Sequence, residues 1–420
     1  MRAVVIGPGL IGCGFVGQLL RSSEWEVCFV GRGPVVDLLR RHRRYLVRLV
    51  EGPDADEVLV DGVSALGLGD RRSAAAAIAG ADLVATAVGP GNLAAIAPAI
   101  ADGLRARQEP NNVIAFENLL RAGPHLRDQV ALHLPPGFPL DGHGFSGAVV
   151  SRAVSQRRWP KAPGDPLVFV GDRPSAFWVD RPALQEPLPE VTGLVATDQY
   201  EARVQAKLYT YSAGHAACAY LGFLKGYHYI HTAIRDPEIE TAVRAAMAEG
   251  QRGLTARHGA ELAGGEKELD AILSRFANAG LADAILRVGR DPRRKLAGDD
   301  RLVGAARLAA ACGPAPEKLA LAVAAALVFC DPSDRSCRGL HRQVAVTGVP
   351  GVLKAVCGLG SDDWLARLVT EEFNRLSAGW AEHNLLLSLE RAFWAWASPA
   401  DLAGPQAVAV DAAPALAGVG

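Results

Sequence analysis

Short apolar runs alternate with amphipathic segments of helical length through the first part of the chain. Residues 2–6 form a short apolar run that predicts a buried strand, and Phe15, Val16, Leu19 and Leu20 then recur at helical spacing. The same pattern predicts further strands near 26–30, 57–60, 83–88, 113–115 and 167–170, and helices near 34–44 and 72–79. Strands that alternate with helices indicate an α/β domain with a doubly wound parallel sheet.

The pattern changes after about residue 195, where Ala, Leu, Arg and Glu dominate and amphipathic segments of helical length recur as far as Trp396. We therefore expect a Rossmann-type dinucleotide-binding domain at 1–195, a mainly α-helical substrate and catalytic domain at 196–404, and a flexible tail at 405–420. The longest apolar run, 319–329, is shorter than the about 20 residues that cross a bilayer, and predicts a buried helix.

Composition excludes several classes of partner. The 44 Lys and Arg residues balance 45 Asp and Glu residues, so no global field attracts nucleic acid or an anionic membrane. The apolar N-terminal stretch follows a single Arg and is interrupted by Pro8, which favours mature protein over a signal peptide. Seven Cys residues without a CxxC pair fit reduced thiols in the cytoplasm, and no cluster suggests zinc.

Three glycines follow the first predicted strand at the spacing of a dinucleotide-binding turn. Gly7 suits the tight turn, Gly9 allows the backbone to approach a pyrophosphate, and Gly12 allows close packing of helix on strand. The following helix N-terminus offers free N–H groups to phosphates. The alternative is a glycine-rich turn in another α/β sheet, but the strand–turn–helix context favours a nicotinamide dinucleotide.

The end of the second predicted strand indicates which nicotinamide cofactor is preferred. An acidic residue at this place would bind the ribose 2′-hydroxyl, whereas this chain has Gly31 and Arg32. Because a guanidinium can bind a 2′-phosphate, the sequence favours NADP over NAD, which stays possible. The basic run at 40–44 is better explained as a solvated helix face.

A lysine, a serine and a histidine share one predicted helix. Ser212 and His215 lie five and eight residues after Lys207, so at about 100° per residue all three fall within an arc of roughly 140°. A desolvated lysine can act as a general base on an alcohol while a histidine binds its oxygen. The alternatives are a solvated lysine and a structural histidine, and these residues alone do not decide between the readings.

Five segments in order resemble the polyol-specific long-chain dehydrogenases, the mannitol dehydrogenase family. They are GPGLIGCGFVGQLL (7–20), LVATAVGP (83–90), NVIAFENLLRAG (112–123), KLYTYSAGHAACAYLG (207–222) and RVGRDPRRKLAGDDRLV (287–303). The resemblance implies a zinc-independent, NAD(P)-dependent oxidoreductase with an N-terminal Rossmann domain, a C-terminal helical domain, and an active site between them.

The resemblance also implies roles for individual residues. Lys207 matches the general base, His215 the histidine that orients the substrate, and Asn118 one of two asparagines that stabilise the oxyanion. Val88 and Gly89 fall in a cofactor-binding segment. Arg287 and Lys295 match residues that contact the polyol.

The segment around Arg287 and Lys295 is strongly basic. It adds Arg290, Arg293 and Arg294, and Pro292 prevents a single smooth helix. Of these, we select Arg290 and Arg294, with Arg287 and Lys295, as a binding site for a substrate phosphate; a solvated basic loop is the alternative.

Two departures from the family pattern concern the substrate. Ser212 stands where the family has its second asparagine, and Ser151 lies in a segment, 146–152, that lacks both of the family's acidic residues while keeping Arg152. The resemblance implies interconversion of a secondary alcohol of a phosphorylated polyol, resembling mannitol 1-phosphate, with its ketose phosphate. The two departures favour the alternative, the same hydride chemistry on another anionic alcohol such as an aldonate or a sugar-phosphate derivative. A non-catalytic nucleotide-binding sensor is a lesser alternative.

Overall fold

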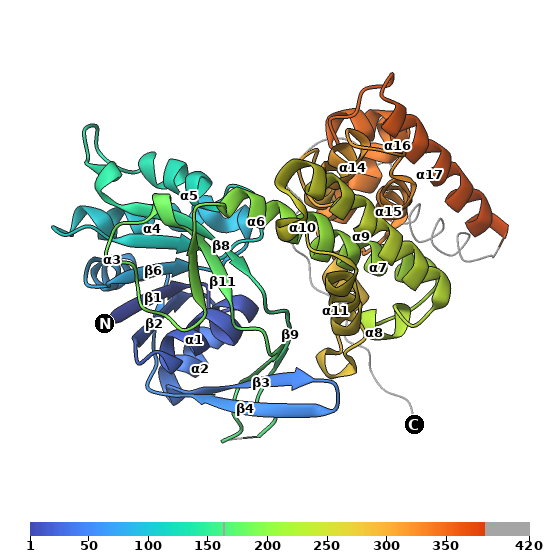
Figure 1. Ribbon diagram of the computed structural model, residues 1–420. Helices are drawn as coiled ribbons and strands as arrows, with labels where there is room; N and C mark the ends of the chain where they lie inside the picture. Colours follow the sequence, from blue (N-terminus) through green and yellow to red (C-terminus); the bar gives the residue numbers. More distant parts are fainter. Residues whose placement is uncertain (163, 383–420) are drawn as a thin grey trace, which may run out of the picture.

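The computed structural model describes residues 1–162 and 164–382, which form a sheet-containing N-terminal domain beside a helical C-terminal domain (Figure 1). The expected α/β class with a mainly helical second domain is confirmed. The predicted tail at 405–420, and the end of the helical domain at 404, lie outside the described residues.

An eight-stranded sheet forms the N-terminal domain, with strand order β12-β11-β8-β7-β6-β1-β2-β5. The strands are β1 (Arg2–Ile6), β2 (Glu26–Gly31), β5 (Ser64–Gly67), β6 (Leu83–Thr86), β7 (Asn112–Ala115), β8 (Gly144–Val150), β11 (Phe177–Asp180) and β12 (Leu194–Thr197). The six strands from β5 to β8 are parallel and have the order of a dinucleotide-binding fold, whereas β11 pairs antiparallel with β8. Strand β12 spans the division expected between residues 195 and 196.

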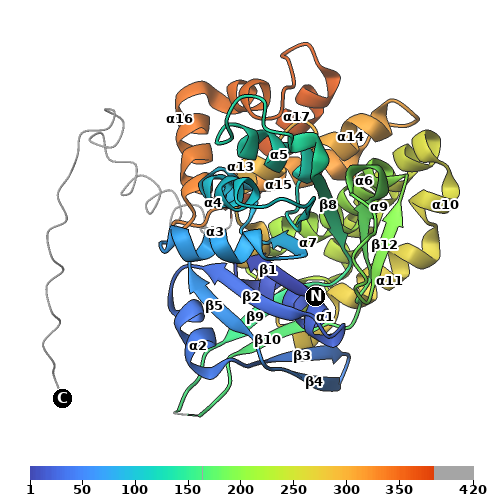
Figure 2. The same cartoon turned by 90° about the vertical axis from the view of Figure 1, so that its left-hand side faces the viewer.

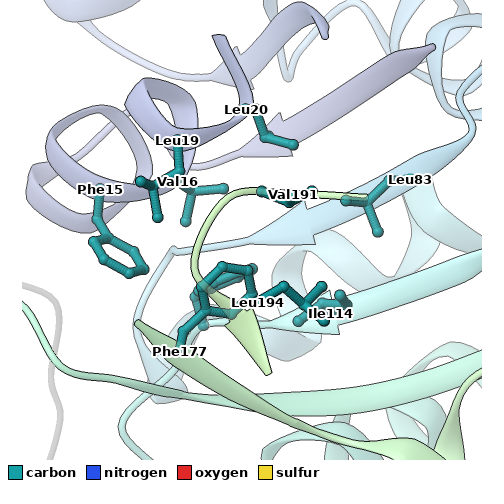
Figure 3. Close-up of a pocket in the computed structure, with 10 residues that line it drawn as sticks. Phe15, Val16, Leu19, Leu20, Leu83, Ile114, Phe177, Val191 and Leu194 are labelled. Atoms are coloured by element: carbon teal, nitrogen blue, oxygen red, sulfur yellow. The ribbon is translucent and has the colours of Figure 1, made fainter. Parts of the chain in front are cut away.

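Helices cover both faces of this sheet (Figure 2). They are α1 (Gln18–Ser22), α2 (Pro34–His42), α3 (Arg71–Ala79), α4 (Leu93–Arg105) and α5 (Ala122–Ala131), with a π-helical segment (Gly12–Gly17) before α1 and short 3₁₀ turns at Pro90–Asn92, Leu140–Gly142 and Arg181–Ala183. Apolar residues of the first helix pack on the sheet and on the segment before β12, as Figure 3 shows for Phe15, Val16, Leu19, Leu20, Leu83, Ile114, Phe177, Val191 and Leu194. This dry packing fixes the helix that follows the glycine-rich turn.

A second, four-stranded sheet has the order β4-β3-β10-β9. Its strands are β3 (Tyr45–Glu51), β4 (Asp54–Val60), β9 (Val154–Arg158) and β10 (Val168–Asp172). Strand β3 was not expected from the sequence. Arg43 has φ 52° and ends α2, so the apolar residues that follow it, beginning with the fully buried Tyr45, leave the helix and form a strand.

The C-terminal domain is helical throughout its described part. Its helices are α6 (Tyr200–Lys207), α7 (Ala213–Leu224), α8 (Ile230–Ala233), α9 (Pro237–His258), α10 (Ala260–Ala263), α11 (Glu266–Phe276), α12 (Ile285–Gly289), α13 (Pro292–Lys295), α14 (Val303–Ala310), α15 (Glu317–Val328), α16 (Arg335–Ala355) and α17 (Trp364–Glu382), with a π-helical segment (Leu208–Ser212) and a 3₁₀ turn (Ala279–Leu281). Helix α15 is buried on nearly all sides, as its Ala-rich sequence predicts. No helix among the described residues combines enough length and apolar character to cross a bilayer.

Candidate active site

A cavity of about 920 Å³ lies between the two domains and is lined by both. Most of the residues selected from the sequence meet there: Val88, Gly89, Asn118, Ser151, Lys207, Ser212, His215, Arg287, Arg290, Arg294 and Lys295. Leu10 and Ile11, from the glycine-rich turn, line the same cavity. The cofactor end and the catalytic end predicted from separate segments therefore share one space.

The glycine-rich turn has the geometry that a dinucleotide needs. Gly7 has φ 101°, and a Cβ atom at Gly12 would lie 1.9 Å from the Gly7 carbonyl oxygen, so both positions require glycine. A Cβ atom at Gly9 would meet nothing within 4 Å, which leaves the backbone there open to approach. These residues fit the pyrophosphate of a nicotinamide cofactor.

Arg32 lies at the end of β2 with an exposed side chain. A Cβ atom at the preceding Gly31 would lie 2.3 Å from Cδ of Pro8, so the turn packs directly on this strand end. Neither residue lines the cavity between the domains, and both lie on the sheet edge where the adenosine ribose binds in this fold.

The loop that carries Val88 and Gly89 is held by a buried carboxylate that the sequence analysis did not single out. Glu117 accepts hydrogen bonds from the Val88 amide at 2.9 Å and from the Thr86 hydroxyl at 2.7 Å. Burial raises the pKa of Glu117 against the opposing effect of these hydrogen bonds. Asn118 follows directly and lines the cavity, so Glu117 fixes the strand ends from which Val88, Gly89 and Asn118 are presented.

Lys207, Ser212 and His215 lie on one continuous helix, but its middle is not α-helical. Helix α6 ends at Lys207, the π-helical segment covers Leu208–Ser212, and His215 lies in the first turn of α7. Because a π-helix bonds residue i to i+5, Ser212 lies about one turn beyond Lys207. All three side chains line the cavity.

The environment of Lys207 makes its amine a weaker base than an ordinary lysine amine. Burial, together with the positive charges of Arg301 and Arg275, lowers the pKa of Lys207 from 10.5 to about 8. Within the described ranges, no group of His, Cys, Asp and Glu is placed to hold a metal ion. An amine that titrates near neutral pH can both accept and donate a proton in this cavity.

His215 is oriented by a carboxylate and an aromatic ring. Its Nε2 atom lies 3.3 Å from Oδ2 of Asp283, and its ring stacks on Phe276 with centroids 4.9 Å apart. Burial lowers the pKa of His215, and the hydrogen bond with Asp283 opposes this shift. A neutral imidazole is therefore held in one orientation at the cavity wall.

Arg287 forms a two-point ion pair with Asp283. Its Nε and Nη2 atoms donate to the two carboxylate oxygens, each at 2.6 Å. Burial would raise the pKa of Asp283, but the charge of Arg287 and the bond to His215 lower it to about 2. Asp283, which the sequence analysis missed, therefore connects the predicted polyol-binding arginine to the predicted substrate-orienting histidine.

Some side chains of the basic segment, Arg287 to Lys295, face the cavity. Arg290 is exposed and lines the cavity, while Arg294 also donates to Asp291 at 2.8 Å and to Asp300 at 3.3 Å. Lys295 is buried and donates to the Arg290 carbonyl, and burial lowers its pKa well below that of a free lysine. Arg293 is exposed and is not part of the cavity lining.

Arg301 is a cavity residue that the sequence analysis did not single out, although it lies in the basic family segment. Its side chain is buried, and its Nε atom donates to Asp300 at 2.7 Å. Its buried Nη2 atom has no hydrogen-bond partner within the described part of the chain. A buried guanidinium nitrogen without a partner next to a cavity is suited to an anionic ligand group.

Ser151 and Arg152 lie where β8 reaches the cavity. The Ser151 hydroxyl donates to the Ala176 carbonyl, and the Ser151 carbonyl accepts from Arg275 at 2.6 Å. Arg152 donates to the Gly14 carbonyl at 3.0 Å and to Gln18 at 2.7 Å, which binds β8 to the helix of the glycine-rich turn. Burial lowers the pKa of Arg152 to about 10.

Comparison with known proteins identifies the family. The family model for the mannitol dehydrogenase Rossmann domain matches residues 1–190, and that for the mannitol dehydrogenase C-terminal domain matches residues 198–349. A mannitol-1-phosphate 5-dehydrogenase from Brevibacillus brevis is 34% identical over 391 residues, covering 91% of this chain and 100% of the relative. One from Geobacillus thermodenitrificans is 35% identical over 387 residues, covering 90% of this chain and 99% of the relative.

Solved structures show the same fold at low sequence identity. Mannitol 2-dehydrogenase of Pseudomonas fluorescens, in a ternary complex with NAD and D-mannitol, has a TM-score of 0.76 at 17% identity and covers 93% of this chain and 94% of its own. A substrate-free D-sorbitol dehydrogenase has a TM-score of 0.66 at 16% identity and covers 87% of this chain and 91% of its own. The resemblance read from the sequence is confirmed, and the chain belongs to the mannitol dehydrogenase family of oxidoreductases.

Proposed function

We propose that the protein interconverts a secondary alcohol of a phosphorylated polyol resembling mannitol 1-phosphate with the corresponding ketose phosphate. The observation that carries this proposal is one cavity that combines Lys207, with its lowered pKa, and the cationic side chains of Arg290, Arg294 and Arg301. The named function of the relatives at 34% and 35% identity supports the same substrate class. They give less support to an aldonate or another anionic alcohol.

The proton-transfer step belongs to Lys207. A bound nicotinamide cofactor supplies the hydride acceptor or donor. In alcohol oxidation the neutral amine of Lys207 takes the proton of the substrate hydroxyl, and in ketone reduction the protonated amine returns it. Asn118, Ser212 and His215 line the cavity beside it and hold the reacting oxygen as charge develops there.

The remaining cationic residues would bind the rest of the substrate. Arg290, Arg294 and Arg301 would hold the phosphate, which would give the buried Nη2 of Arg301 a partner that residues 1–162 and 164–382 do not supply. Arg287 and Lys295 would contact the polyol hydroxyls. Ser151 would contact the polyol from the side of the sheet. Ser151 and Ser212 give this cavity smaller polar groups than the family pattern has at these positions.

For the cofactor we propose NADP in preference to NAD. The exposed guanidinium of Arg32 stands at the end of β2 and can bind a 2′-phosphate. Gly7, Gly9 and Gly12 would hold the pyrophosphate, and Val88 and Gly89 would contact the nicotinamide half.

Absorbance of the reduced nicotinamide tests the function directly. We expect reduction of fructose 6-phosphate to be faster than that of unphosphorylated fructose or tagaturonate, with either cofactor. Lys207→Ala should lower turnover by ~10²–10⁴-fold, the usual contribution of a general base, whereas Lys267→Ala, on the exposed side of α11, should not. Turnover of Lys207→Ala within about tenfold of the parent protein would exclude the proposed proton transfer.

A further inference from the structure

Two cysteines and a histidine meet behind the basic segment, outside the cavity. Cys330 follows the end of α15 and is half-buried, Cys337 lies in the first turn of α16 and is 1% exposed, and His341 lies one turn further along α16. The Cys337 Sγ atom lies 3.2 Å from the Phe329 carbonyl oxygen, to which it donates, and accepts from the Asp331 amide at 3.2 Å. Phe329 and Asp331 flank Cys330 in the chain, so these two contacts hold the Cys337 thiol beside Cys330.

These contacts divide the two thiols into a reactive and an unreactive one. Interaction with the Cys337 thiol lowers the pKa of Cys330, burial opposes this, and interaction with His341 lowers it further. The pKa of Cys337 is raised by its interaction with Cys330 and by burial. A partly accessible thiolate beside a protonated thiol is the arrangement of an attacking and a resolving cysteine.

The loop between the two cysteines supports the cavity wall. Asp334, the N-cap of α16, accepts from the Asp291 amide at 2.6 Å, and the Ser336 hydroxyl accepts from the Arg293 amide at 3.3 Å. Asp291 has φ 59°, a left-handed conformation that an Asp residue adopts when its surroundings hold it there. Residues 330–337 therefore fix the backbone that carries Arg290 and Arg294.

A second contact couples the same loop to this backbone. The ring of Phe329 packs on Gly289, where a Cβ atom would lie 2.6 Å from the ring. The Cys337 thiol binds the carbonyl of this same Phe329. A change at Cys337 thus reaches the basic segment both through Phe329 and through the Asp334 and Ser336 bonds.

We propose that Cys330 and Cys337 form a reversible disulfide on exposure to a peroxide, and that this bond weakens binding of the anionic substrate. The Cys330 thiolate attacks one peroxide oxygen, the O–O bond breaks, and a sulfenic acid forms with release of hydroxide, which takes up a proton to become water. The Cys337 sulfur then attacks the Cys330 sulfur, the S–O bond breaks, and the second water leaves. Two thiols are oxidised and one peroxide is reduced.

The disulfide removes the hydrogen that Cys337 shares with the Phe329 carbonyl and draws its Sγ atom toward Cys330. A disulfide also requires Cβ atoms about 3.5–4.5 Å apart, so the eight residues from Cys330 to Cys337 must adjust. The Asp334 and Ser336 contacts lie within that stretch. This part of the inference rests on the proposed function, because it assigns substrate binding to Arg290 and Arg294.

Peptide mapping of the full-length reduced protein, before and after hydrogen peroxide and with alkylation of remaining thiols, tests the modification. We expect a peptide pair linked through Cys330 and Cys337 that a dithiol reductant separates. Cys330→Ser should abolish the link, whereas Cys312→Ser, which removes an exposed thiol elsewhere, should leave it intact. Absence of the link, or oxidation of Cys330 to the sulfinic acid without it, would overturn the proposal. If Cys330→Ser folds poorly, Cys330 of the parent protein is alkylated before the peroxide is added, and this should abolish the link in the same way.

The consequence for the site is measured in two ways on the same oxidised sample. The KM for fructose 6-phosphate should rise about tenfold, corresponding to the loss of one charge-assisted hydrogen bond, and return on reduction. Hydrogen exchange of the amides at 289–295 should become faster, which needs no substrate. A linked protein with unchanged exchange and unchanged KM would refute the coupling. If the protein reduces no sugar phosphate, the proposed function fails, and the link and the exchange rates still decide this inference.

Discussion

The acid–base chemistry of Lys207 makes a quantitative prediction for the dependence of catalysis on pH. With a pKa of about 8, the fraction of neutral amine rises from about 9% at pH 7 to about 91% at pH 9. A lysine with its ordinary pKa of 10.5 would be about 0.03% neutral at pH 7. Alcohol oxidation needs the neutral amine, so its kcat/KM should rise about tenfold between pH 7 and pH 9.

Ketone reduction needs the protonated amine, so its kcat/KM should fall about tenfold over the same interval. The assay follows reduced nicotinamide in both directions at constant ionic strength. Substrate ionisation does not disturb it, because the second pKa of a phosphate monoester lies near 6. Lys207→Arg retains the positive charge, but a guanidinium does not release its proton in this pH range. Alcohol oxidation by this variant should therefore be lost between pH 7 and pH 9.

A mirror-image pair of profiles crossing near pH 8 would support the role of Lys207. Oxidation that is independent of pH between 7 and 9, or that keeps rising in proportion to hydroxide beyond pH 10, would show that the proton goes to a group other than a desolvated lysine. Oxidation by Lys207→Arg at a rate close to that of the parent protein would lead to the same conclusion.

Three further substitutions test separate parts of the site. Arg32→Ala should raise the Kd for NADPH at least about tenfold and leave the Kd for NADH nearly unchanged, because one charge-assisted contact to the 2′-phosphate is lost. Fluorescence titration measures both dissociation constants. An equal rise in both would contradict the NADP preference. Arg290→Gln should raise the KM for fructose 6-phosphate more than the KM for fructose. The same change at Arg293, which lies outside the cavity lining, should not do so. If Arg290→Gln leaves the ratio of the two KM values unchanged, the basic segment is a solvated loop. Asp283→Asn leaves Arg287 without its buried counter-charge and should lower the free energy of unfolding by about 3–5 kcal/mol in urea titrations, and a loss below about 1 kcal/mol would show that the pair is dispensable.

The architecture of the first domain was accessible from the sequence because its signals are local. The run at 2–6, the glycine spacing and the helical recurrence of Phe15, Val16 and Leu19 each depend on neighbouring residues, and the structure places β1, the turn and the first helix accordingly. Strand β3 was missed because the apolar residues after Arg43 fit a continuing helix as well as a strand. The left-handed backbone at Arg43 ends the helix and so decides in favour of a strand. Arg is not a residue type that predicts a left-handed conformation.

The site was predictable where family segments carry it, and less so where distant residues complete it. Lys207, His215 and Asn118 stand in segments that the resemblance identifies, and all three line the cavity. Asp283 lies 68 positions after His215, and its role appears only when folding brings it within 3.3 Å. Arg301 was within a segment that carries the resemblance, but the absence of a hydrogen-bond partner for its Nη2 atom among the described residues is a property of packing that the sequence does not reveal.

The widened turn at Leu208–Ser212 has a consequence for how this helix can vary in length. The π-helical turn holds five residues where an α-helix would hold about four, so deletion of one residue between Lys207 and Ser212 would convert it to regular α-helix and leave Ser212 and His215 on nearly the same face. Deletion of one residue in the regular helix between Ser212 and His215 cannot be absorbed in this way, and would rotate His215 by about 100° away from Asp283 and Phe276. The helix can therefore lose a residue before Ser212 but not after it.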